Sequence, residues 1–212
     1  MTKIYLSKLN KDKKEDIRVT RTKRDLGAAL LKLLDTKNFD DITVKEICET
    51  ALVSKLTFYN NFLNKNSLMI YVFQSATMNT LDNLRKTYFD TVSQDRVYRE
   101  VLASLINMFY SEESKLRKII ANDKNKSIYS CLYQFLKELI PEIIIRHNKE
   151  MADKVPTEII SSYYAGALTG LLYSLASENF DVSDEQMTDY IYTLTTSQIM
   201  HMPNLLFDED EI

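Results

Sequence analysis

The segment TVKEICETALVSKLTFYNNF, Thr43 to Phe62, carries the most specific structural signals of the sequence. Thr43 stands three residues before Glu46, the spacing of a capping box in which the two residues satisfy amide groups at a helix start. Ser54 is a second N-cap, only a few residues after the first of these helices must end near Ala51. The segment therefore predicts two short helices that meet at a tight turn.

The apolar residues of this region recur at helical spacing and predict which faces point inward. Two stripes have the spacing of one helix face: Leu26, Ala29, Leu30, Leu33 and Leu34; then Val44, Ile47, Cys48 and Ala51. In a third, Phe58 and Phe62 are four residues apart and share a face that can dock inward together with Val53. The last stripe leaves Leu56, Thr57, Asn60 and Asn61 for the outer face of the second short helix. That outer face is the first candidate binding surface.

A helix, a tight turn and a second helix with a polar outer face is the arrangement that places the second helix in the major groove of DNA. Asn60 can offer its amide as paired donor and acceptor to adenine, and Leu56 and Thr57 can meet a thymine methyl group. Asn61 belongs to the same predicted set. The alternative is a solvated face without a partner.

Further residues are predicted to contact phosphates around this helix. Lys55 and Tyr59 flank its outer face, and Thr43 and Lys65 stand at the starts of neighbouring helices, where exposed amides favour anions. Thr20 and Arg21, which follow the basic leader, are assigned to the same set.

The charge of the chain is divided unevenly. Residues 1–65 carry 14 Lys and Arg against 9 Asp and Glu, a net charge of +5, while the remainder is at −8, so that the total is −3. Basic residues concentrate in residues 1–17, as in arms that seek phosphates. The alternative for this arm is a solvated tail.

The stretch FDDITVKEICETALVSKLTFYNNFLNKNSLM closely resembles the DNA-binding head of TetR-family transcriptional regulators. The resemblance covers about residues 20–69 and implies an all-α fold, with a helix-turn-helix domain over residues 18–65 and a helical regulatory and dimerisation domain over residues 66–212. It further implies a homodimer that binds a near-palindromic operator, usually represses, and releases DNA when a small molecule binds. Two residues depart from the family pattern: Leu52 replaces the usual turn glycine and Leu56 replaces a small residue.

Beyond the head, the sequence predicts helices over residues 65–89, 96–111, 113–121, 126–148, 157–177 and 184–202, with Pro141 expected to kink or divide the fourth. Two glycines four residues apart, Gly166 and Gly170, allow another backbone to approach closely. With Ile191, Leu194 and Ile199 they are predicted to form a dimer interface. The alternative is a pair of ordinary core helices in a monomer.

A small-molecule pocket is predicted from aromatic and soft apolar residues with phenolic groups, the mixture that lines such sites: Met108, Phe109, Tyr129, Tyr133, Tyr163 and Tyr164. The acidic body favours a neutral or cationic effector. The alternative is that these residues are only core.

Other classes of protein fit less well. The sequence shows no catalytic motif, phosphate loop or metal cluster, so we expect no enzyme, no cofactor and no metal. The longest apolar run is too short and too interrupted for a membrane span, and two isolated cysteines without a secretory signal indicate the cytoplasm. The main alternative to a DNA-binding regulator is a helical interaction module or co-regulator whose head binds protein.

Overall fold

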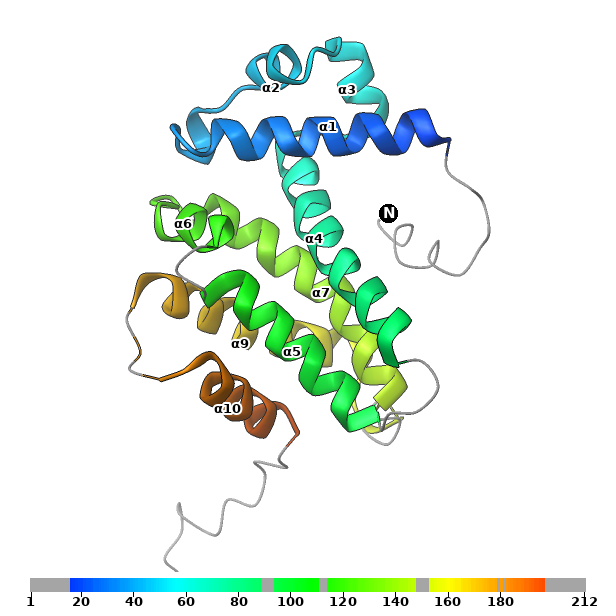
Figure 1. Cartoon of the computed structure of the whole chain (residues 1–212), viewed down its shortest axis with the longest axis vertical. Helices are drawn as coiled ribbons and strands as arrows, with labels where there is room; N and C mark the ends of the chain where they lie inside the picture. The colour runs from blue at the N-terminus through cyan, green and yellow to red at the C-terminus, as the bar shows by residue number, and fades with distance from the viewer. Residues whose placement is uncertain are drawn as a thin grey trace, which may run out of the picture.

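The computed structural model describes residues 16–88, 94–110, 114–147, 153–178, 180 and 182–196. Every regular element within these ranges is helical, which confirms the all-α prediction. The helices form a head, drawn at the top of Figure 1, and a larger body below it. A single long helix runs from one to the other.

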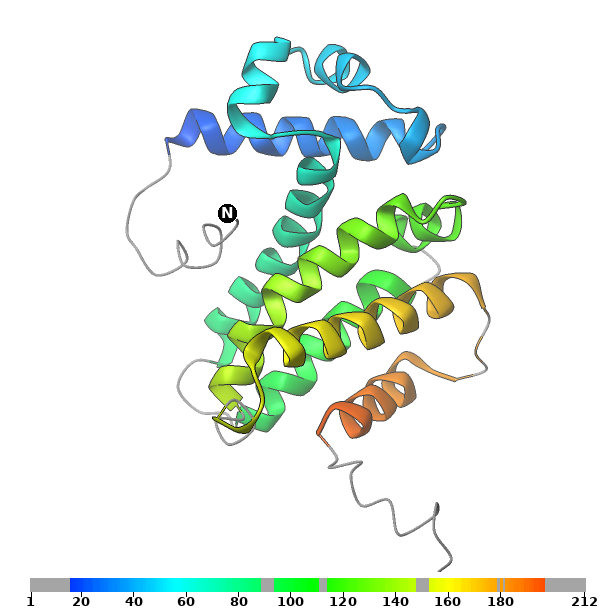
Figure 2. The ribbon, with the colours of Figure 1, turned by 180° about the vertical axis from the view of Figure 1, so that it is seen from behind.

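The head consists of α1 (Ile17–Leu33), the short 3-10 helix η2 (Phe39–Asp41), α2 (Val44–Ala51) and α3 (Lys55–Asn61). Helix α1 begins at Ile17 because Asp16 caps it, accepting from the backbone N–H of Arg18 at 2.9 Å. Helices α2 and α3 lie together across one side of α1 (Figures 1 and 2). Apolar side chains from all three helices fill the space between them: Leu26 and Leu30 from α1, Ile47 from α2 and Phe58 from α3.

The body begins with α4 (Lys65–Tyr88), which leaves the head and runs down against α7 (Ser127–His147) and α5 (Gln94–Tyr110). Helix α9 (Thr157–Ser177) packs mainly on α7, α10 (Asp184–Thr196) packs on α5, and α6 (Lys115–Ala121) lies on the head side. The predicted end of the last helix lies outside the described residues. Pro141 lies inside α7 without dividing it.

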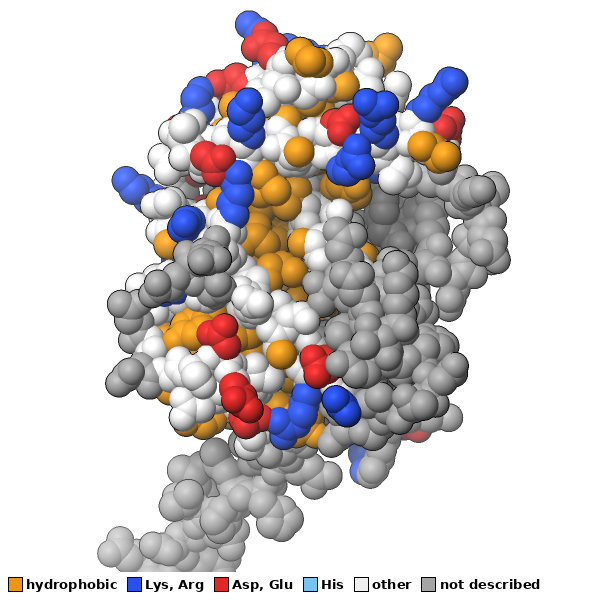
Figure 3. Space-filling model, viewed as in Figure 1, with side chains coloured by type: hydrophobic (Ala, Val, Ile, Leu, Met, Phe, Trp, Pro, Cys, Tyr) orange, Lys and Arg blue, Asp and Glu red, His pale blue; other side chains and the backbone are white. Residues whose placement is uncertain are grey.

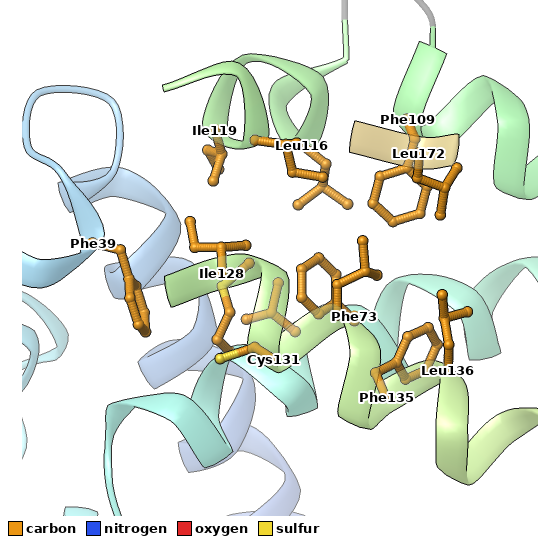
Figure 4. Close-up of a cluster of buried hydrophobic side chains, with 14 of the residues drawn as sticks. Phe39, Phe73, Phe109, Leu116, Ile119, Ile128, Cys131, Phe135, Leu136 and Leu172 are labelled. Carbon is orange, nitrogen blue, oxygen red and sulfur yellow. The ribbon is translucent and has the colours of Figure 1, made fainter. Parts of the chain in front are cut away.

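Three phenylalanines form the centre of the body. The ring of Phe73 on α4 lies 6.1 Å from that of Phe109 on α5 and 5.9 Å from that of Phe135 on α7, centroid to centroid. Leu172 of α9 lies beside Phe109 in the same cluster (Figure 4). Because side chains from four helices meet here, the body has one shared apolar core.

Among the described helices, α9 alone is long and apolar enough to match a membrane span by length and composition. Its residues Ala165, Thr169 and Leu172 are buried within the protein. Core helices of globular proteins share this composition, and α9 makes its main contacts with α7.

Candidate DNA-binding surface

The capping box predicted at the start of α2 is present. The backbone N–H of Glu46 donates to Thr43 Oγ1 at 3.2 Å, and the backbone N–H of Thr43 donates to Glu46 Oε2 at 2.9 Å. Lys37 also donates to the Glu46 carboxylate. The hydrogen bond from Lys37, followed by those from Thr43, lowers the pKa of Glu46 to about 2. These bonds fix the start of α2.

The turn between α2 and α3 contains a strained residue. Leu52 adopts φ 56° and ψ 40°, the left-handed conformation that favours glycine, and its side chain is 92% exposed. The Val53 backbone N–H donates to Cys48 O at 3.0 Å, which closes the end of α2. The chain therefore forms the left-handed turn with a leucine, although glycine would adopt this conformation at a lower energy.

Helix α3 presents a mixed outer face to solvent. Ser54 caps it, accepting from the Thr57 N–H at 3.0 Å, while Phe58 and Phe62 are buried against the rest of the head as predicted. At 3.6 residues per turn, Tyr59 and Leu56 lie at the middle of the outer face. Lys55 and Asn60 border them on opposite sides; all four of these side chains are exposed.

Two residues predicted on this outer face lie farther inward. Thr57 and Asn61 are half-buried, because the face they share begins to turn toward the head. Asn61 Nδ2 donates to Thr57 O at 2.8 Å, and Thr57 Oγ1 lies 2.9 Å from Ser54 Oγ. Their polar atoms are partly used within the helix, so Asn60 is the outward amide of α3.

The structure contradicts the prediction that Lys65 contacts a phosphate. Its ammonium group donates to three backbone carbonyls of the η2 loop, Phe39 O at 2.7 Å, Asp40 O at 2.9 Å and Ile42 O at 3.0 Å. It also lies 4.8 Å from the centre of the Phe39 ring. An ammonium group has three hydrogens, and all three are used. Lys65 therefore holds the η2 loop on the start of α4.

The remaining predicted phosphate contacts are available to different extents. Thr43 is exposed, but its hydroxyl donates to Glu46 Oε2 at 2.7 Å. A phosphate contact at this position would therefore use backbone amides of the first turn of α2. Thr20 and Arg21 are exposed on α1, where the Arg21 guanidinium lies 3.7 Å from Asp25. Basic and acidic side chains alternate over the head in Figure 3. Residues 16–65 have a net charge of +2, so most of the basic excess belongs to residues 1–15.

The head is attached to the body through the η2 loop. Phe39 is buried beside Ile128 and Cys131 of α7 (Figure 4). The carboxylate of Asp40 accepts from Asn125 Nδ2 and from Ser127 Oγ, both at 2.6 Å. These two bonds lower the pKa of Asp40.

Asp123 connects this attachment to α9. Its carboxylate accepts from backbone N–H groups at the start of α7, including that of Ile128 at 2.9 Å, and from the hydroxyl of Tyr173 at 2.5 Å. Burial, and then the bond to Asp123, raises the pKa of Tyr173. A polar cleft of about 120 Å³ lies between residues 38–41 and 122–125, too small for a drug-sized ligand.

Comparison with known proteins agrees with this architecture. A TetR family model described as "Transcriptional regulator C-terminal region" matches residues 96–197. The HTH-type transcriptional regulator YvdT of Bacillus subtilis is 24% identical over 169 residues, which cover 74% of this chain and 81% of the relative. The chain belongs to the TetR family of transcriptional regulators.

Two further relatives extend the comparison. The HTH-type regulator YxbF of Bacillus subtilis is 28% identical over 103 residues, but this match covers 46% of the chain and only 27% of the relative. A solved TetR-family regulator from Syntrophomonas wolfei has the same fold, with a TM-score of 0.57 and 19% identity, and the match covers 86% of this chain and 98% of that one. At this identity the structural match establishes the fold alone.

In this TetR-family body the predicted pocket residues differ widely in their exposure to solvent. Tyr163 is 67% exposed on α9, whereas Phe109 is fully buried in the aromatic core. The other four are half-buried: Met108, Tyr129, Tyr133 and Tyr164. No local sequence feature singles out Thr77, whose buried hydroxyl has no hydrogen-bond partner among the described residues.

The residues predicted for the dimer face differ in their exposure within the single chain. Ile191 is buried against the chain's own core, whereas Leu194 is 57% exposed and Ile199 lies outside the described residues. Among the described residues, nothing lies within 4 Å of a Cβ atom placed on Gly166 or Gly170. No described part of the chain therefore covers the glycine side of α9.

Proposed function

We propose that the protein is a homodimeric, sequence-specific DNA-binding regulator that represses from a near-palindromic operator and is released by a small-molecule effector. The observation that carries this proposal is the exposed face of α3, where Asn60 is the outward amide and Lys55 lies on the opposite border. A recognition helix of this kind reads base edges with its outward side chains while neighbouring helix starts contact phosphates.

Selection of binding sites from a random duplex pool tests DNA recognition. At moderate salt, we expect an enriched palindrome with one well-defined half-site for each recognition helix. The Asn60→Ala variant should lose about 1 to 3 kcal/mol of binding free energy and blur one position in each half-site. Asn66→Ala, an exposed amide on α4, is the matched control and should leave the selected sequence unchanged. A folded protein that enriches no sequence would contradict the proposal.

Dimerisation is supported by an apolar face on α9 that no other part of the described chain covers. Ile159 and Tyr163 are exposed on the same side of α9 as Gly166 and Gly170, and Leu194 is exposed on α10. Small residues on such a face let two helices approach closely, and the exposed apolar side chains would be removed from water.

The molecular mass in solution tests this interface. We expect light scattering to give twice the chain mass, 24.7 kDa, for the unmodified protein, and a shift toward the monomer for Tyr163→Glu. Ile17→Glu, which replaces a similarly exposed apolar residue in the head, should remain dimeric. A Tyr163→Glu protein with the mass of an intact dimer would exclude this face as the interface.

An effector site is supported by the unpartnered hydroxyl of Thr77. Thr77 is 2% exposed and lies one helical turn from Phe73 on the same side of α4. A buried hydroxyl without a partner costs free energy, which a bound molecule with a hydrogen-bonding group would recover. The acidic body favours a neutral or cationic molecule.

A thermal-shift screen of small neutral and cationic aromatic compounds tests the effector proposal. A true effector should raise the melting temperature of the protein and weaken its binding to the selected operator, and Thr77→Val should reduce both effects. The operator affinity of the unliganded Thr77→Val variant should stay unchanged. Compounds that stabilise both proteins equally would place the site elsewhere.

The alternative function, a protein-binding head, is favoured by the exposed leucines Leu52 and Leu56. Binding to a helical partner through this face should be insensitive to salt and to competing duplex DNA. Binding to DNA should weaken steeply with salt, because counterions are released from the phosphates. The salt dependence therefore separates the two functions.

A further inference from the structure

We propose that Leu56 reads a thymine methyl group, so that each operator half-site depends on the C5 methyl of one thymine. This inference rests on the proposed function and names the feature of DNA that the unusual leucine recognises. In the sequence, Thr57 was an equal candidate for such a contact. The structure distinguishes the two residues by the exposure of their side chains.

Leu56 is 72% exposed and is the second residue of α3, near the N-terminal end, where recognition helices approach base edges. Thr57 is half-buried and its hydroxyl faces Ser54. Leu56 is therefore the aliphatic side chain of α3 that projects from the helix toward a partner. An aliphatic group has no hydrogen bond to offer, so the matching feature of a base edge is the thymine methyl group.

The surroundings of Leu56 favour DNA over an apolar protein surface. Lys55 and Asn60 border the outward face, and the sequence of α3, KLTFYNN, holds no acidic residue. A positive side chain on one side and a base-reading amide on the other suit a groove lined by phosphates.

The spacing along α3 makes the inference specific. Leu56 and Asn60 are four residues apart and lie on the same side of the helix. Four residues rise about 6 Å along the axis, and stacked bases are about 3.4 Å apart. The thymine read by Leu56 should therefore lie about two base-pair steps from the adenine read by Asn60.

The test replaces thymines of the selected operator by deoxyuridine, one at a time, which removes the methyl group and keeps every hydrogen-bonding atom. One position per half-site should weaken binding of the unmodified protein about fourfold, the value of one buried methyl group at about 0.8 kcal/mol. Substitution in both half-sites should weaken it about 15-fold. Dissociation constants from fluorescence anisotropy provide the measurement.

The decisive comparison is with Leu56→Ala, which should bind the thymine and deoxyuridine operators equally. Because Leu56 is largely exposed, this variant is expected to fold, and its melting curve verifies that. Leu63→Ala removes a leucine that is 82% exposed just beyond α3 and should keep the full dependence on the methyl group. Leu56→Met preserves an apolar side chain of similar reach and should restore the dependence on the methyl group that Leu56→Ala loses.

The outcomes distinguish this inference from the proposed function. If the folded protein selects no operator, both fail together. If it selects an operator but no thymine position responds to deoxyuridine, or if the response persists in Leu56→Ala, only the reading of the methyl group by Leu56 is refuted. Loss of the response in Leu56→Ala alone supports it.

Discussion

Replacing Leu52 with glycine should stabilise the protein. Leu52 has φ 56° and ψ 40°, and its side chain is 92% exposed, so removing the side chain gives up almost no burial. The left-handed conformation costs an ordinary residue about 1 to 2 kcal/mol, and glycine avoids that cost. Glycine also gains freedom in the unfolded chain, which removes about 0.4 to 1 kcal/mol of the benefit. The net increase in unfolding free energy should be about 0.5 to 1 kcal/mol.

Thermal and urea unfolding of the matched variants provide the assay. For a chain of this size the gain corresponds to a rise in melting temperature of about 1 to 4 °C. Leu52→Ala keeps the backbone strain and removes the leucine side chain, so it should leave stability nearly unchanged. Lys126→Gly, at the other described non-glycine residue with positive φ, also 56°, should give a gain of similar size.

The sum of the two gains offers a further check. Leu52 lies in the head and Lys126 in the loop before α7, so the double variant should show additive effects within about 0.5 kcal/mol. The strain argument is refuted if Leu52→Gly melts at or below the temperature of Leu52→Ala. In that case the left-handed turn carries no recoverable cost.

Four further predictions concern stability and reactivity. Lys65→Met should lower unfolding free energy by about 2 kcal/mol, because three carbonyls lose a charged donor, and should leave the salt dependence of DNA binding unchanged; calorimetry and binding titrations at several salt concentrations check both. Glu46 has a pKa of about 2 in the folded protein against an ordinary 4.5, so the stability it contributes is complete above about pH 4.5 and is lost as the pH falls toward 2; urea unfolding across that window should show a weaker pH dependence for Glu46→Gln. Burial raises the pKa of the Cys131 thiol to about 12, so mass spectrometry should detect its alkylation at pH 8 only in unfolding conditions, and rapid alkylation of the native protein would contradict its burial. Thr77→Val should raise unfolding free energy by about 1 kcal/mol in the absence of effector, because it removes a buried hydroxyl without a partner; an equal or lower melting temperature would show that the hydroxyl is satisfied in solution.

The head was predictable from sequence because its signals are local. The capping box of Thr43 and Glu46, the N-cap at Ser54 and the inward spacing of Phe58 and Phe62 each involve residues three or four positions apart. Such interactions are nearly complete within one helical turn, so residue type and spacing identify them. The same holds for α9, whose predicted and observed bounds coincide at Thr157 and Ser177.

The errors concern residues whose role depends on distant segments. Lys65 stands at a helix start, where a phosphate contact is a reasonable prediction, yet its donors go to carbonyls 23 to 26 residues earlier in the chain. Ile191 and Leu194 share the apolar character expected of an interface, but α5 covers the first and leaves the second exposed. Neither distinction is present in the local sequence.

The helical class, the helix-turn-helix geometry and the TetR family could therefore be predicted from the residues alone, because short-range capping and periodicity encode them. Long-range contacts in the folded chain establish that Lys65 holds the η2 loop, that Leu56 rather than Thr57 projects from α3, and that Thr77 has no hydrogen-bond partner among the described residues. The physical reason is that burial and hydrogen-bond saturation depend on which distant groups the fold brings within a few ångströms.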